Sequence, residues 1–208
     1  MKFVLFVEGQ TERNSAAEFL KRWIDPQLNN RVGIQVVRFN GYAELARQMA
    51  TKAQMYLTGP QNHEIIAVIG LLDLYGPDFY PIEMTTAEDR YNWGKDHFEN
   101  IVNDTRFRMH FAVHEFEAWL LSDPGVFSRE VREALPAKVN RPESVNFNEP
   151  PAKLLDRIYN QVTRRSYKKT TYGKQLFAKL DPAVAKTKCP YLSLMLEDLL
   201  ALAKNAGL

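Results

Sequence analysis

Several acidic residues stand directly after short apolar runs, and this placement is typical of sites that bind a cation. Glu8 and Asp73 each follow one such run, and Glu115 and Glu117 follow another. Carboxylates held close together repel one another unless a positive group neutralises them. Mg²⁺ and Mn²⁺ are hard ions that take oxygen ligands, polarise a phosphoryl oxygen and activate water. The residue types therefore predict metal-dependent phosphoryl chemistry.

Two further residues have roles that the sequence leaves open. Glu12 lies four residues beyond Glu8, and it is either an additional metal-bridging acid or a charge at the start of a helix. Histidine side chains titrate near neutral pH, so for His114 an acid/base role stands beside a purely structural one. The acids at strand ends have a simpler alternative too, as solvated loop residues or helix-start charges.

The pair Glu115 and Glu117 falls at the start of an expected helix over 114–121. Residues two positions apart on an α-helix point about 200° away from each other. Only one of these two acids is therefore expected to face the site, and Glu115 is favoured because it is nearer the strand end.

The spacing of apolar residues predicts the elements that position these acids. Runs rich in Val, Ile and Phe alternate with segments of helical spacing, which is typical of an α/β fold with a mostly parallel sheet. In such a sheet, ligands bind beyond the carboxyl ends of the strands, so the acids should meet at one edge. The expected strands are 2–7, 34–39, 64–72 and 107–113, and the clearest expected helices are 11–23, 43–57, 86–100, 114–121 and 191–203.

Composition and charge describe the chain as a whole. Apolar residues make up 45% of it, which excludes a disordered protein. Residues 151–208 hold 11 Lys+Arg and 4 Asp+Glu, whereas residues 1–150 hold 16 and 21. We expect a core over 1–122 and a basic helical extension over 123–208 that packs on it. The single cysteine, Cys189, excludes an internal disulfide and fits the cytoplasm, and no run is long enough to span a membrane.

A basic and aromatic segment of the extension predicts contact with nucleic acid. Cations bind phosphates, and aromatic rings stack on unpaired bases. A solvated surface is the alternative interpretation. The residues predicted to bind nucleic acid are Lys153, Arg164, Arg165, Lys168, Lys169, Tyr172 and Lys174.

Segments throughout the chain resemble a known family. Val4–Glu12 is similar to the first motif of Toprim domains, which occur in topoisomerases, primases and the overcoming-lysogenization-defect nucleases. The closer resemblance is to a bacterial Toprim-like family catalogued as domain of unknown function 4276. The similar segments are Glu8-Gly9-Gln10-Thr11-Glu12, Asp73-Leu74-Tyr75-Gly76, His114–Leu121, Pro151, Lys153, Tyr172, Lys174 and Cys189-Pro190-Tyr191.

This resemblance implies a Toprim-like, Rossmann-like sheet and a nuclease that uses Mg²⁺ or Mn²⁺, in a bacterial defence or genome-maintenance system with an ATPase partner. The implied catalytic residues are Glu8, Asp73, Glu115 and Lys174, with the lysine stabilising charge on the phosphate. The implied metal ligands are Glu8, Glu12, Asp73, Glu115 and Glu117.

The chain departs from the Toprim pattern at one position. The second Toprim motif has two aspartates separated by one residue, but Leu74 and Tyr75 follow Asp73 here. Asp78 could replace the missing ligand only if the turn at Gly76 folds it back. The departure leaves open a second function, a non-catalytic subunit that binds nucleic acid or a partner protein.

Overall fold

The structure is a computed structural model that describes residues 1–144 and 149–208. Within these residues, four parallel strands form one sheet in the order β2-β1-β3-β4. The predicted α/β class, a parallel sheet flanked by helices, is confirmed. The strands are β1 (Lys2–Val7), β2 (Gly33–Arg38), β3 (Ile65–Asp73) and β4 (Phe107–Ala112).

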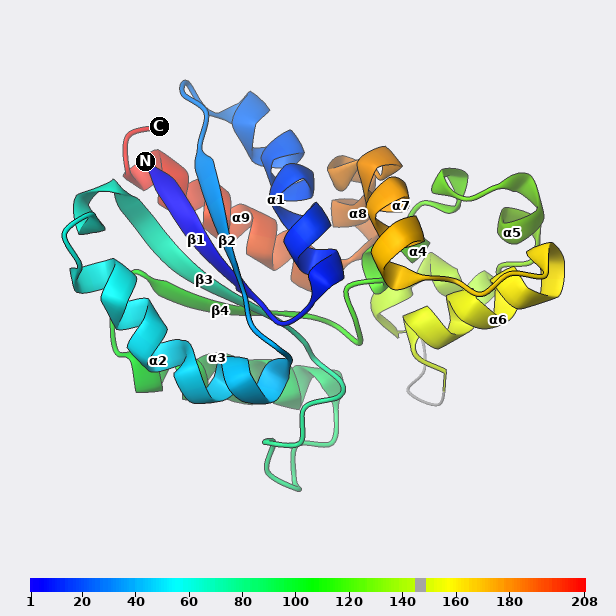
Figure 1. Cartoon of the computed structure of the whole chain (residues 1–208), viewed down its shortest axis with the longest axis horizontal. Helices are drawn as coiled ribbons and strands as arrows, with labels where there is room; N and C mark the ends of the chain where they lie inside the picture. The colour runs from blue at the N-terminus through cyan, green and yellow to red at the C-terminus, as the bar shows by residue number, and fades with distance from the viewer. Residues whose placement is uncertain (145–148) are drawn as a thin grey trace.

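Helices cover both faces of the sheet (Figure 1). On one face lie α1 (Gln10–Ile24) and α9 (Pro190–Asn205), and on the other lie α2 (Tyr42–Thr58) and α3 (Ala87–Val102). Successive side chains of a strand point to opposite faces. Phe3 and Leu5 of β1 therefore pack with α1, whereas Val4 and Phe6 pack with α2. Burial on both faces explains why β1 is a continuous apolar run.

Short helices gather beyond the carboxyl ends of the strands, on the right in Figure 1. They pack on the sheet-covering helices, since α1 contacts α7 and α8, and α9 contacts α8. The division of the chain at residue 122 stays a prediction. No helix in the described ranges has the length and apolarity needed to cross a membrane. These elements are α4 (Ala118–Leu121), α5 (Arg129–Glu133), α6 (Pro151–Thr163), a π-helical turn (Lys169–Gly173), α7 (Lys174–Lys179) and α8 (Pro182–Lys188).

One predicted element is wrong in its first turn. The backbone of His114 has a φ of 64°, and α4 begins only at Ala118. A residue in the left-handed region cannot continue a right-handed helix, so residues 114–117 lie in a turn. The other predicted elements agree with the structure to within one or two residues at each end.

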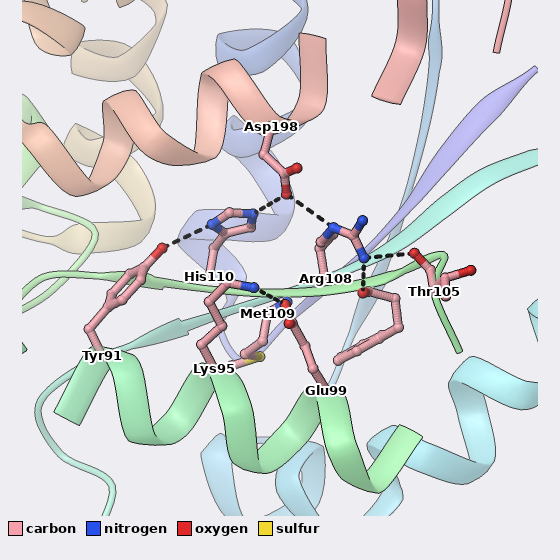
Figure 2. A network of polar contacts seen from close by, with 9 residues as sticks. Tyr91, Lys95, Glu99, Thr105, Arg108, Met109, His110 and Asp198 are labelled. Atoms are coloured by element: carbon pink, nitrogen blue, oxygen red, sulfur yellow. Dashed lines mark hydrogen bonds and ion pairs between the residues drawn. The ribbon is translucent and has the colours of Figure 1, made fainter. Parts of the chain in front are cut away.

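A buried polar network fixes α9 to the edge strand β4 (Figure 2). The imidazole of His110 hydrogen-bonds the hydroxyl of Tyr91 through Nδ1 at 3.1 Å and the carboxylate of Asp198 through Nε2 at 3.1 Å. The guanidinium of Arg108 lies 3.6 Å from the same carboxylate. The network therefore joins α3, β4 and α9 through partly buried side chains.

Replacing Asp198 by asparagine is expected to lower the free energy of unfolding by about 1–3 kcal/mol near neutral pH, the usual range for a hydrogen bond to a charged group. Burial opposes ionisation of Asp198, but its hydrogen bond to His110 and the charges of His110 and Arg108 hold the pKa of this carboxyl below its usual value. A depressed carboxyl pKa stabilises the fold above the unfolded-state pKa, and this stabilisation is lost as pH falls through the folded-state pKa.

Urea unfolding of both proteins near pH 7 and near pH 3 measures this effect. The difference between them should shrink at the lower pH. The matched control is Glu197→Gln, at an exposed neighbour on α9 that pairs with Lys186, and it should change stability by less than about 0.5 kcal/mol. An equal loss in Asp198→Asn at both pH values would contradict the electrostatic explanation.

Candidate metal centre

The carboxyl ends of β1, β3 and β4 bring their acids together as predicted. Val7 pairs with Leu71, and Asp73 pairs with Ala112, so the residues after these positions meet at one edge. The backbone N–H of Asp73 donates to Glu8 Oε1 at 3.0 Å. The parallel register thus places the carboxylate of Glu8 directly against the end of the neighbouring strand.

The turn after β4 completes this edge. The backbone N–H of Phe116 donates to Asp73 Oδ1 at 2.8 Å. This bond fixes the carboxylate of Asp73 against residues 115–117, whose turn begins at the left-handed His114. The backbone strain at His114 therefore serves to direct the chain across the end of β3.

A lysine provides the positive charge among these acids. Lys169 Nζ lies 3.1 Å from Glu117 Oε2 and 3.7 Å from Glu115 Oε2. Burial lowers the pKa of Lys169, but the charges of Glu117, Asp73 and Glu115 outweigh burial and raise it. Lys169 is therefore a cation that these carboxylates share.

One ammonium group does not neutralise the whole cluster. Burial raises the pKa of Asp73 well above its usual value, and the charges of Glu8, Glu12 and Glu117 raise it further. Burial also raises the pKa of Glu117 to about 7, although Lys169 opposes the shift. The pKa values of Glu8 and Glu12 are raised by burial as well. The protein alone thus holds these acids with too little positive charge.

Glu12 joins the cluster because α1 begins immediately after Glu8. The side chain of Glu12 is buried with 7% of its surface exposed. A Cβ atom at Gly9 would overlap Glu12 Oε2, so a larger residue there would displace the carboxylate of Glu12. The charge of Glu8 raises the pKa of Glu12 further, as expected for neighbouring carboxylates.

Several buried oxygens of this cluster lack a hydrogen-bond donor within the described part of the chain. They are Glu12 Oε2, Glu117 Oε1 and Tyr167 Oη. Buried polar atoms of this kind call for an ion or water as their partner. Carboxylate oxygens are the ligands that Mg²⁺ and Mn²⁺ prefer, so the donor set fits such an ion chemically.

The cluster is not a preformed set of ligands. Among residues 1–144 and 149–208, no three His, Cys, Asp or Glu side chains converge as they would around a metal ion. Lys169 instead contacts Glu115 and Glu117. A divalent cation would therefore have to replace the ammonium group or bind beside it with movement of the acids.

The expectation that only one of Glu115 and Glu117 faces the site is wrong. Both contact Lys169, because residues 114–117 form a turn rather than a helix. Glu115 Oε2 also accepts a hydrogen bond from the backbone N–H of Ala152 at 2.9 Å, in the first turn of α6. Glu117 is fully buried, and no backbone N–H within the described residues donates to it.

The turn after β3 does not carry Asp78 back to the cluster. Gly76 has a φ of 116°, and Asp78 is exposed, where its Oδ1 accepts a hydrogen bond from the hydroxyl of Tyr42 at 3.2 Å. Asp78 is therefore not a replacement for the second Toprim aspartate in this structure.

Sequence comparison decides the family. The model of the family Domain of unknown function (DUF4276) matches residues 7–200. The chain belongs to this family. The resemblance that the sequence motifs indicated is confirmed.

The DUF4276 chain is also similar to two solved structures. It shares 20% identity with the C-terminal region of the Burkholderia pseudomallei OLD protein, covering 99% of this chain and 98% of that one, with a TM-score of 0.48. It shares 19% identity with the C-terminal region of the Xanthomonas campestris pv. campestris OLD protein, covering 98% and 97%, with a TM-score of 0.45. A search of the curated proteins gave no match.

The residues predicted to bind nucleic acid occupy different places in the DUF4276 chain. Lys169 lies with the acids. Lys174 is exposed and lines a hollow between α1 and α7, where it forms no ion pair with a described residue. Tyr172 is half-buried, next to the other tyrosines of the extension. The remaining predicted residues are exposed and are Lys153, Arg164, Arg165 and Lys168.

Two members of the cluster are not predicted by the sequence. The sequence predicts that Lys169 binds nucleic acid, and it predicts no contact of Tyr167 with the acids. The charges of Glu117, Glu115 and Glu12 raise the pKa of Tyr167, after the larger effect of burial. The sequence contained one signal for Lys169. Five acids were predicted at one site, and a basic side chain from elsewhere in the chain could neutralise part of their charge.

Proposed function

We propose that this protein hydrolyses phosphodiester bonds in nucleic acid with a divalent cation, Mg²⁺ or Mn²⁺, held by Glu8, Asp73 and Glu117. The observation that carries the proposal is the cluster of partly and fully buried carboxylates, which has orphaned oxygens and, among the described residues, one ammonium group. Family membership supports it, because the motifs that resemble Toprim nucleases include Glu8 and Asp73.

The bound ion would polarise a phosphoryl oxygen and lower the pKa of a water molecule. The protein's residues would position this chemistry. The N–H groups of Asp73 and Phe116 orient the carboxylates of Glu8 and Asp73. We place Glu12 and Glu115 as supporting acids, since the first lies in the first turn of α1 and the second is held by Ala152.

Lys169 is better placed than Lys174 to stabilise charge on a phosphate. Its ammonium group contacts Glu117 and Glu115, whereas Lys174 lies in a separate hollow. A lysine beside developing negative charge lowers the barrier of such a reaction. Lys169 would thus neutralise the acids in the resting protein and the phosphate during the reaction.

Incubating the purified protein with DNA or RNA and with Mg²⁺ or Mn²⁺ tests the proposal. We expect cleavage that chelation with EDTA abolishes. Glu8→Gln should reduce the rate by at least roughly 10–100-fold. This is the loss found when a residue that only supports a metal ligand is replaced, and Glu8 is proposed as a ligand itself. The control Glu64→Gln, at the opposite end of β3 beside Lys2, should cleave normally. Equal rates in Glu8→Gln and in the unchanged protein would remove Glu8 from the mechanism.

One observation favours a second function, a non-catalytic subunit that binds nucleic acid or a partner such as an ATPase. Asp78 is held by Tyr42 and does not replace the missing aspartate. This function predicts no cleavage with either metal, and no heat of Mn²⁺ binding in a calorimetric titration.

A further inference from the structure

A positively charged groove lies beside the segment that carries Lys169. Two hollows, of about 370 and 590 Å³, share Arg165, Tyr172 and Gln175 in their linings and so form one groove. These volumes are in the range of about 300–1,000 Å³ found for ligand sites. The groove lies along α6, α7 and the π-helical turn between them.

The charge of the groove indicates an anionic ligand. Its cations are Arg165, Lys168 and Lys179. None of them forms an ion pair within the described ranges, and no acid from these ranges lines either hollow. Phosphate groups are the ligands that a row of free Lys and Arg side chains binds.

The aromatic side chains indicate what accompanies the phosphates. Tyr172 lines both hollows. The centroid of its ring lies 5.3 Å from that of Tyr159 and 6.3 Å from that of Tyr167. These contacts hold the ring of Tyr172 in place while leaving it partly exposed. A fixed, partly exposed ring beside phosphate-binding cations is the platform on which an unpaired base stacks.

The groove and the acidic cluster lie on adjacent residues of one segment. Lys168 lines the groove, and the next residue, Lys169, contacts Glu117. Consecutive Cα atoms are about 3.8 Å apart, so the two sites share one stretch of backbone. Tyr167 precedes both lysines and packs on Tyr172. The charges of Glu117 and Glu115 raise the pKa of its hydroxyl, in addition to the larger effect of burial.

We infer that this groove binds an unpaired nucleic-acid strand and presents it to the acidic cluster, so that single-stranded segments are the substrate. This deepens the proposed function, because it names the substrate class of the same centre. A duplex satisfies the cations equally well but keeps its bases paired, so it gains nothing from Tyr172.

Fluorescence anisotropy with a labelled oligothymidylate of about 12 nucleotides, within the roughly 4–16 nucleotides that such sites contact, tests the inference. The measurement is made in EDTA, so that binding is separated from cleavage. We expect a duplex of the same length to bind at least about tenfold more weakly. Tyr172→Leu should weaken binding of the single strand by about 5- to 150-fold, the effect of one lost stacked base, and Tyr172→Phe should restore it.

Two further variants keep the test independent of the tyrosine packing. Arg165→Ala with Lys168→Ala should reduce the slope of log affinity against log salt by about 0.7 for each cation removed. Arg129→Ala, at an exposed cation of α5 paired with Glu133, should leave the slope unchanged. Equal affinity for the duplex, or an unchanged affinity in Tyr172→Leu, would overturn the inference.

The outcomes separate this inference from the proposed function. Binding of the single strand that depends on Tyr172, without cleavage in Mg²⁺ or Mn²⁺, would support the groove and overturn the nuclease. Cleavage together with equal binding of single strand and duplex would overturn the groove alone.

Discussion

Replacing Glu117 by glutamine is expected to stabilise the metal-free protein by about 3 kcal/mol above pH 8, more than a 100-fold change in the folding constant. Glu117 is fully buried, and burial raises its pKa to about 7 from an ordinary 4.5. Ionising it in the folded protein therefore costs free energy, and glutamine has nothing to ionise.

The pH range follows from the sign of this shift. A carboxyl whose folded-state pKa is raised favours folding fully below its unfolded-state pKa, and that advantage is lost as pH rises through the folded-state pKa. Glu117→Gln should therefore match the unchanged protein near pH 4, exceed it increasingly between about pH 4.5 and 7, and keep a constant advantage above about pH 8. Lys169 keeps Glu115 as a partner in this variant.

Urea unfolding across this pH range, with and without Mn²⁺, measures both effects. Mn²⁺ should stabilise the unchanged protein but not Glu117→Gln, because the variant lacks a proposed ligand. The control Glu133→Gln removes an exposed acid that pairs with Arg129, and it should change stability by no more than about 1 kcal/mol at any pH. A Glu117→Gln protein that is less stable above pH 8 would contradict the account of the cluster.

Replacing Lys169 by methionine is expected to have the opposite effect. Lys169 is the cation that Glu115 and Glu117 share, so its removal leaves buried carboxylates unpaired. Breaking a fully buried pair costs about 3–5 kcal/mol. We expect about 2 kcal/mol, because 41% of the Lys169 side chain is exposed and solvent screens part of the charge.

The stability lost in Lys169→Met should depend on pH. The acids raise the pKa of Lys169, and a raised lysine pKa stabilises the fold at all pH values below the unfolded-state pKa of about 10.4. The loss should therefore be complete above about pH 8. It should shrink as pH falls through about 7, where Glu117 gains a proton.

Metal binding distinguishes this role of Lys169 from ordinary packing. In Lys169→Met the acids no longer have an internal cation, so Mn²⁺ should bind at least about tenfold more tightly. Lys168→Met is the matched control, because this adjacent lysine forms no ion pair with a described residue. Its Mn²⁺ affinity and stability should be unchanged. An unaltered Mn²⁺ affinity in Lys169→Met would mean that Lys169 does not compete for the cation position.

The sequence was sufficient to predict the sheet and the acids at its edge. Alternating apolar runs and helical segments predict parallel strands, and parallel strands place Glu8 and Asp73 at the same edge. The strength of this prediction comes from β1 and β3, which are buried on both faces and hence apolar throughout.

The parts that sequence could not predict depend on tertiary structure. Helical periodicity over residues 114–121 concealed the left-handed backbone of His114, a conformation that costs free energy and persists only where its surroundings enforce it. For this reason the sequence predicted that only one of Glu115 and Glu117 would face the site. Lys169 is distant in sequence from the acids, and no local pattern predicts which of several clustered lysines turns inward.

Anomalous X-ray scattering from a crystal soaked in Mn²⁺ tests the central claim most directly. The account predicts a peak bounded by the carboxylates of Glu8, Asp73 and Glu117, with the ammonium group of Lys169 moved away from Glu117. A crystal that shows no peak at this edge of the sheet, with Lys169 still bound to Glu117, would contradict it.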